Sequence, residues 1–101
     1  KGIDIKAPAG DIVRAAAEGK VVYCDAKMRG FGMTVIIDHG HSFQSVYSYN
    51  SEISVKLGDI VRAGDPIARV GSTGRAKVPS LHFEIRKDGV AVNPLAYLQR
   101  G

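Results

Sequence analysis

A repeated segment is the feature of this sequence that most restricts its fold. Residues Gly10–Ala15 read Gly-Asp-Ile-Val-Arg-Ala, and the same letters return at Gly58–Ala63. Each copy precedes a Gly and then an apolar, β-rich run, Lys20–Tyr23 after the first and Pro66–Val70 after the second. The repeat predicts two related β-hairpins that face each other across one core.

The rest of the chain favours an all-β fold. Helical periodicity is nearly absent, while short β-rich runs bounded by Gly, Pro, Asn and Asp recur throughout. The predicted strands are Gly2–Lys6, Asp11–Ala15, Lys20–Ala26, Met33–His39, Phe43–Tyr49, Asp59–Arg62, Pro66–Val70, Leu81–Lys87 and Val90–Val92. Helical turns are expected only at Ala15–Glu18 and Pro94–Gln99, and Asp88-Gly89 is expected to close a tight hairpin.

Length and composition allow one small globular domain over residues 1–101. A chain of 101 residues buries roughly 60–65% of its extended surface, which leaves no room for a second domain. No apolar run approaches the roughly 18 to 20 residues that span a bilayer, and the N-terminus lacks the hydrophobic stretch of a signal peptide. Because the chain begins without Met, we expect it to be part of a longer protein.

Charge and cysteine content exclude several functions. The net charge of +4 favours an anionic partner, but the basic residues are scattered, and four Tyr and three Phe give little stacking surface. We therefore expect no nucleic-acid partner. The single Cys24 lies in an apolar run and is expected to be a small buried residue, because one cysteine forms no internal disulfide and no paired-cysteine zinc site.

The strand around His82 is the first candidate for a site. Alternation along this strand sends Leu81, Phe83 and Ile85 to the core and the opposite set to the other face, namely Ser80, His82, Glu84 and Arg86. The Gly-containing segment 71–78 is long enough to form one wall of a groove. From the residues alone, His82 is either a ligand or an ordinary surface residue.

Two further patterns have competing interpretations. The repeated Gly-Asp-x-Val-x-Ala segments also resemble lipoyl and biotinyl carrier domains, but these need a Met-Lys hairpin tip, and Lys27-Met28 reverses that order. His39 and His41 offer two imidazoles two residues apart, which suits a metal. Gly40 marks a turn between them, and a solvated strand end is the favoured interpretation.

Segments along the whole chain are similar to the LytM/lysostaphin-type domain of zinc peptidoglycan endopeptidases. The resemblance is carried by Gly2–Ile5, Ala7–Gly10, Ala16–Val21, Gly30–Gly32, Ile37–Gly40, Val55–Gly58, Gly71–Gly74, Leu81–Arg86 and Val92–Leu95. It implies a small antiparallel β-sandwich with duplicated hairpins and a long groove, in agreement with the repeat.

The resemblance also implies a zinc held by two His and one Asp, with two further His near the metal-bound water. It places ligands at Asp4 and His82 and the remaining ligand one residue before Lys1. The two catalytic histidine positions hold Tyr49 and Ser80, and neither hydroxyl titrates near neutral pH as an imidazole does. We therefore predict no peptidase activity and no cofactor, with zinc bound only if the residue before Lys1 completes the site.

Domains of this kind that lack the catalytic histidines resemble the non-enzymatic activators of cell-wall amidases, the EnvC and NlpD type. This implies a C-terminal domain of a longer, periplasmic envelope protein that binds a peptidoglycan amidase through the vacated groove. The expected lining is Arg29, Phe31, Tyr49, Arg75, Lys77, Ser80, His82 and Arg86. Two alternatives stay open: a peptidoglycan-binding scaffold module, and an active zinc endopeptidase with an unconventional base.

Overall fold

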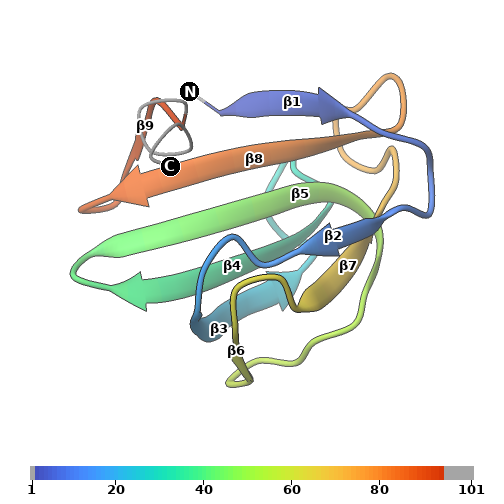
Figure 1. Ribbon diagram of the computed structural model, residues 1–101. Coiled ribbons are helices and arrows are strands. Elements are labelled where there is room, and N and C mark those ends of the chain that lie inside the picture. Colours follow the sequence, from blue (N-terminus) through green and yellow to red (C-terminus); the bar gives the residue numbers. More distant parts are fainter. Residues whose placement is uncertain (1, 95–101) are drawn as a thin grey trace.

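The computed structural model describes residues 2–94, and this part of the chain is built from β-strands (Figure 1). Its strands are β1 (Ile3–Lys6), β2 (Ile12–Arg14), β3 (Gly19–Asp25), β4 (Met33–Gly40), β5 (Phe43–Ile53), β6 (Ile60–Val61), β7 (Pro66–Val70), β8 (Ser80–Lys87) and β9 (Val90–Val92). Among the described residues, no helix is long and apolar enough to cross a membrane.

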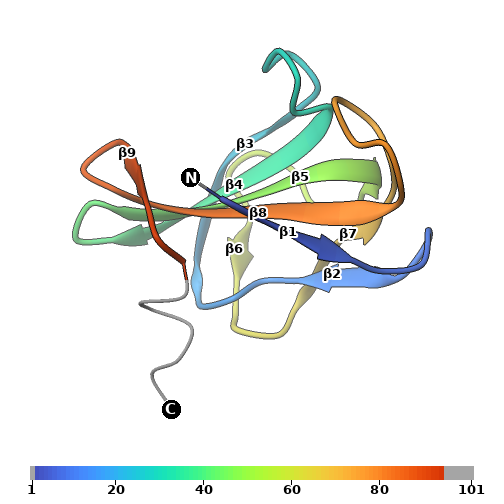
Figure 2. The ribbon, with the colours of Figure 1, turned by 90° about the horizontal axis from the view of Figure 1, so that it is seen from above.

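All strand pairs are antiparallel, which confirms the predicted all-β class. The hydrogen-bonded order is β1-β8-β5-β4-β3-β6, with β9 on β8 and β7 between β5 and β2. The β2–β7 pair is thus joined to the main sheet by the pairing of β7 with β5. Seen from above (Figure 2), β2 lies on one side of β8, and the β3–β4 loop lies on the other.

The two copies of the repeat are interleaved, so the prediction that each forms its own hairpin is wrong. β2 of the first copy pairs with β7 of the second, and β3 of the first pairs with β6 of the second. The two copies make matching backbone hydrogen bonds. The Gly10 amide donates to the Val70 carbonyl, and the Gly58 amide donates to the Val21 carbonyl, each at 2.8 Å. Gly10 and Gly58 both have a φ of 92°, which explains why the repeat begins with glycine.

The helical turn expected at Ala15–Glu18 is also wrong, because its amides bond elsewhere. The Ala15 amide donates to the Asp65 carbonyl at 2.9 Å, and the Ala16 amide donates to the Tyr47 hydroxyl at 2.9 Å. These contacts leave the segment as a bend. The other helical turn, expected at 94–99, lies outside the described residues from position 95 onward.

The hairpin at Asp88-Gly89 is confirmed, since both residues have positive φ angles, 54° and 79°. Strand β5 differs most from prediction, because it continues past Tyr49 to Ile53. Its first part pairs with β4 and β8, and its last part pairs with β7. Tyr49 lies at the change of partner with a φ of 71°, a left-handed conformation that is uncommon outside glycine.

One hydrophobic core lies between the β2–β7 pair and the main sheet. It contains Val13, Ala15, Val21, Val35, Ile37, Tyr47, Val61, Ile67, Ala68, Val70 and Phe83. The rings of Tyr47 and Phe83 are 5.4 Å apart, and the predicted inward direction of Phe83 is confirmed by its 4% exposure. Cys24 is half-buried and packs against this core.

Replacing Phe83 with Ala should lower the free energy of unfolding by about 3–5 kcal/mol, because the change leaves a cavity beside Tyr47. Chemical denaturation measures the loss. Val90→Ala on the exposed turn side of β9 is the control and should change stability by less than about 0.5 kcal/mol. A loss below about 1 kcal/mol for Phe83→Ala would contradict the core assignment.

Candidate functional site

Two loops meet above the end of β8 where His82 lies. The β3–β4 loop (26–32) and the β7–β8 loop (71–79) are joined by the Arg75 amide, which donates to the Gly30 carbonyl at 2.9 Å. The Met33 amide also donates to the Thr73 hydroxyl at 3.2 Å. Added Cβ atoms at Gly32 and Gly74 would lie within 2.6 Å of the opposite loop, so this close approach needs glycine.

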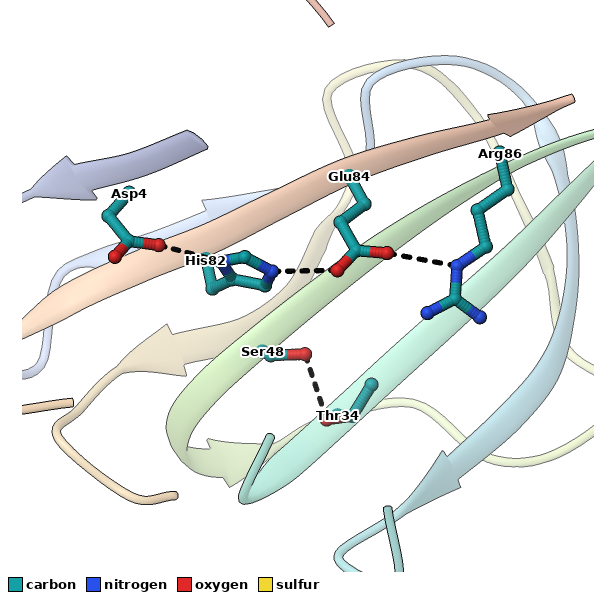
Figure 3. A network of polar contacts seen from close by, with 6 residues as sticks. All are labelled: Asp4, Thr34, Ser48, His82, Glu84 and Arg86. Atoms are coloured by element: carbon teal, nitrogen blue, oxygen red, sulfur yellow. Dashed lines mark hydrogen bonds and ion pairs between the residues drawn. The ribbon is translucent and has the colours of Figure 1, made fainter. Parts of the chain in front are cut away.

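A chain of polar contacts runs from Asp4 on β1 along β8 to Arg86 (Figure 3). The His82 Nδ1 lies 2.6 Å from Asp4 Oδ1, and its Nε2 lies 2.7 Å from Glu84 Oε2. The Arg86 Nε–H donates to Glu84 Oε1 at 2.9 Å. Because ionised carboxylates only accept hydrogen bonds, His82 serves both neighbours fully when it carries a proton on each ring nitrogen.

Glu84 is the buried centre of this chain. Its side chain is only 6% exposed, whereas that of Asp4 is 58% exposed. Burial by itself would raise the pKa of Glu84, but the hydrogen bonds from His82 and Arg86, with their charges, hold that pKa below its ordinary value. Glu84 is therefore a buried carboxylate anion with a donor on each oxygen.

Aromatic rings enclose His82 from two sides. The Phe31 ring meets it edge-on with centroids 5.5 Å apart, and the Tyr49 ring is tilted against it at 5.3 Å. The Arg86 guanidinium also lies 5.9 Å from the Phe31 ring centre. We call these four residues, Phe31, Tyr49, His82 and Arg86, the His82 cluster. They come from β5, β8 and the β3–β4 loop and were all in the predicted groove lining.

Below His82 lie two buried hydroxyls that sequence reasoning missed. Thr34 and Ser48 are fully buried, and their hydroxyl oxygens are 2.9 Å apart (Figure 3). Thr34 also donates to the Gly32 carbonyl at 3.1 Å, and Ser48 faces His82 in the β5–β8 register. Strand alternation could have predicted the position of Ser48. Successive side chains of a strand point to opposite faces, so Ser48 lies on the face opposite to Tyr47, which is the face of His82.

The other predicted lining residues are placed differently. Arg29, Arg75 and Lys77 are exposed on the two loops, and the Arg75 side chain passes within 3 Å of where a Gly30 Cβ would lie. Ser80 is only 5% exposed, and its hydroxyl donates to the Val78 carbonyl at 3.1 Å. Ser80 therefore lies beneath the surface and presents little of itself to a partner.

Tyr49 is unsuited to replace an imidazole base. Burial raises the pKa of its phenol above the ordinary value, and the carboxylates of Asp4 and Glu84 raise it further, while the positive charge of Arg75 opposes them. The phenol therefore stays protonated at neutral pH. With Ser80 bonded to a backbone carbonyl, neither of the two positions predicted to be catalytic holds a group that titrates near neutral pH.

Asp4 and His82 are close enough to share a metal ion, since Asp4 Oδ1 lies 2.6 Å from His82 Nδ1. Within residues 2–94, no group of three or more His, Cys, Asp or Glu side chains is arranged to hold one. His82 would also have to exchange one of its two carboxylate contacts for the metal. The residues described here thus do not fit a three-ligand zinc site.

A cavity of about 480 Å³ lies away from the His82 cluster. It is lined mainly by apolar atoms of residues that include Ala16, Phe43 and Ile85. His39 also borders it, but its Nδ1 lies 2.7 Å from the Glu18 carbonyl and its Nε2 lies 2.6 Å from the Ser45 hydroxyl. These contacts give His39 a structural role in joining β4 and β5 to the bend before β3.

The model of Peptidase family M23 matches residues 1–94. The chain belongs to this family. It is 47% identical to the murein hydrolase activator EnvC of Escherichia coli K12 over 99% of its own length and 24% of EnvC. It is also 47% identical to the lipoprotein NlpD/LppB homolog of Pseudomonas aeruginosa, over 99% of this chain and 33% of that protein. The chain thus spans a quarter to a third of these relatives.

Solved structures of the family confirm the fold. The catalytic domain of lysostaphin from Staphylococcus simulans superposes with a TM-score of 0.90 at 30% identity, covering 97% of this chain and 77% of that domain. The resemblance inferred from the sequence motifs is therefore confirmed. The family includes peptidases.

The chain of residues 1–101 should retain no stoichiometric zinc after dialysis, because Asp4 and His82 supply only two ligands. Elemental analysis measures the metal content, and a chelator should leave the unfolding temperature unchanged. One tightly held zinc per chain would overturn this prediction.

Proposed function

We propose that this domain binds and activates a peptidoglycan amidase of the bacterial envelope and does not itself hydrolyse the cell wall. The observation that carries the proposal is that the two positions where the family resemblance predicts catalytic histidines hold Tyr49, whose phenol pKa is raised, and Ser80, whose hydroxyl is bonded to the backbone. The similarity to a relative named as a murein hydrolase activator also supports the proposed activator role. We infer a periplasmic location from the murein target.

The residues that replace the catalytic centre are suited to binding a protein segment. The His82 cluster combines two aromatic rings with a guanidinium, and such residues dominate the energetics of protein interfaces. Exposed Arg29, Arg75 and Lys77 surround it with positive charge. We therefore expect an acidic partner segment that places apolar atoms against Phe31 and Tyr49.

A peptidoglycan-binding scaffold is the second candidate. Stem peptides of the wall carry free carboxylates, so the same basic loops would favour them. Pulldown of an amidase from envelope extract and sedimentation with purified sacculi distinguish the activator from the scaffold. Sedimentation without an amidase in the pulldown would favour the scaffold.

Reversing the charge of Arg29 or Arg75 to Glu should weaken amidase binding about tenfold and reduce activation in parallel, because attraction to an acidic segment is lost. Added salt should weaken the wild-type complex for the same reason. Arg62→Glu, at an exposed position just after β6 and away from the two loops, makes the same charge change and is the control. Unchanged activation by both loop variants would place the partner surface elsewhere.

Tyr49→Gly should weaken binding by about tenfold with less dependence on salt, because its ring contributes apolar contact. Glycine is chosen because Tyr49 has a φ of 71°, which glycine adopts freely, so the bend is kept. Calorimetric titration with the amidase at two salt concentrations measures both effects. Wall hydrolysis by the wild-type domain alone, abolished by a chelator, would instead establish the peptidase alternative.

A further inference from the structure

We propose that Glu84 is a positioning residue that fixes the Arg86 guanidinium as a receptor for a carboxylate of the partner segment. This inference rests on the proposed function and names the chemistry that the site recognises. The ligand is an acidic side chain next to an aromatic or aliphatic one, carried on a protein segment.

Glu84 holds Arg86 through the guanidinium nitrogen that lies closest to the chain. Its Oε1 accepts from Arg86 Nε at 2.9 Å, while its Oε2 faces His82 at 2.7 Å. The Glu84 side chain is 6% exposed, so the acceptor is itself immobilised by burial. A guanidinium bound through Nε keeps its plane and direction fixed.

The two terminal nitrogens of Arg86 remain for a ligand. Among the described residues, only the Nε of this guanidinium has a hydrogen-bond partner, and neither terminal nitrogen has one. The Arg86 side chain is 23% exposed, and the Phe31 ring lies 5.9 Å from its Cζ. Paired terminal nitrogens match the two oxygens of a carboxylate, which gives a geometrically specific contact.

The neighbouring rings determine the second part of the ligand. Phe31 contacts both His82 and Arg86, so a carboxylate on Arg86 lies beside an apolar surface. Asp4 lies at the opposite end of the chain of polar contacts from Arg86, and His82 and Glu84 lie between them (Figure 3). The positively charged end of that chain, Arg86, is therefore the recognition group.

The experiment titrates the protein with acetyl-Phe-Glu-amide and acetyl-Phe-Gln-amide and follows both by NMR. The wild-type domain should bind the Glu peptide about tenfold more tightly than the Gln peptide, and Glu84→Gln should reduce this preference to less than about twofold. The Arg86 Nε–H signal should be protected from exchange with water in the wild type and lose that protection in Glu84→Gln. A merely structural role for Glu84 would not move the peptide preference in a folded variant.

Two variants complete the design. Glu52→Gln is the matched control, because Glu52 also contacts an arginine Nε, that of Arg69 at 3.3 Å, on an exposed surface away from His82. It should keep the full peptide preference. Arg86→Lys retains the charge but lacks the paired nitrogens, and it should lose the preference even if Glu84→Gln fails to fold.

Three results would overturn the inference: full peptide preference in folded Glu84→Gln, full preference in Arg86→Lys, or soluble peptidoglycan fragments binding at Arg86 more tightly than the acidic peptide. The amidase assay is scored separately. Activation by the wild type together with no carboxylate preference would reject the role of Glu84 alone. Carboxylate preference with no activation of any amidase would reject the proposed function.

Discussion

The bend of β5 at Tyr49 is the constraint on which the rest of the structure depends. It lets one strand pair first with β4 and β8 and then with β7, which closes the core. A non-glycine residue in the left-handed region costs about 1–2 kcal/mol. Surrounding bonds offset this cost: the Tyr49 amide donates to the Phe31 carbonyl at 2.9 Å, and Asn50 Nδ2 donates to the Tyr47 carbonyl at 2.8 Å.

The same bend builds the candidate site. By turning at Tyr49, the chain places this ring against His82 and ties β5 to the loop that carries Phe31. The interleaved repeat then holds the other side of the core, since each copy completes the strands of the other. Backbone hydrogen bonds therefore join β5 and the two loops around the site, which suits a preorganised binding surface.

Around His82, the described groups hold a fixed geometry. Tyr49 stays protonated, Ser80 is buried, and Glu84 contacts His82 Nε2 and Arg86 Nε at once. A buried carboxylate with a donor on each oxygen resists rearrangement, because moving it would leave an unpaired charge in the interior.

The sequence by itself determined the all-β class, the strand positions and the inward direction of Phe83, because these follow from local patterns of two to eight residues. It also identified Tyr49, His82 and Arg86 as candidates through family motifs. Only the tertiary structure decided that the repeats interleave, that β5 continues past Tyr49 and that Glu84 is buried between His82 and Arg86. Pairing partners and the burial of Glu84 depend on contacts between distant strands, and no local pattern encodes which strands will meet.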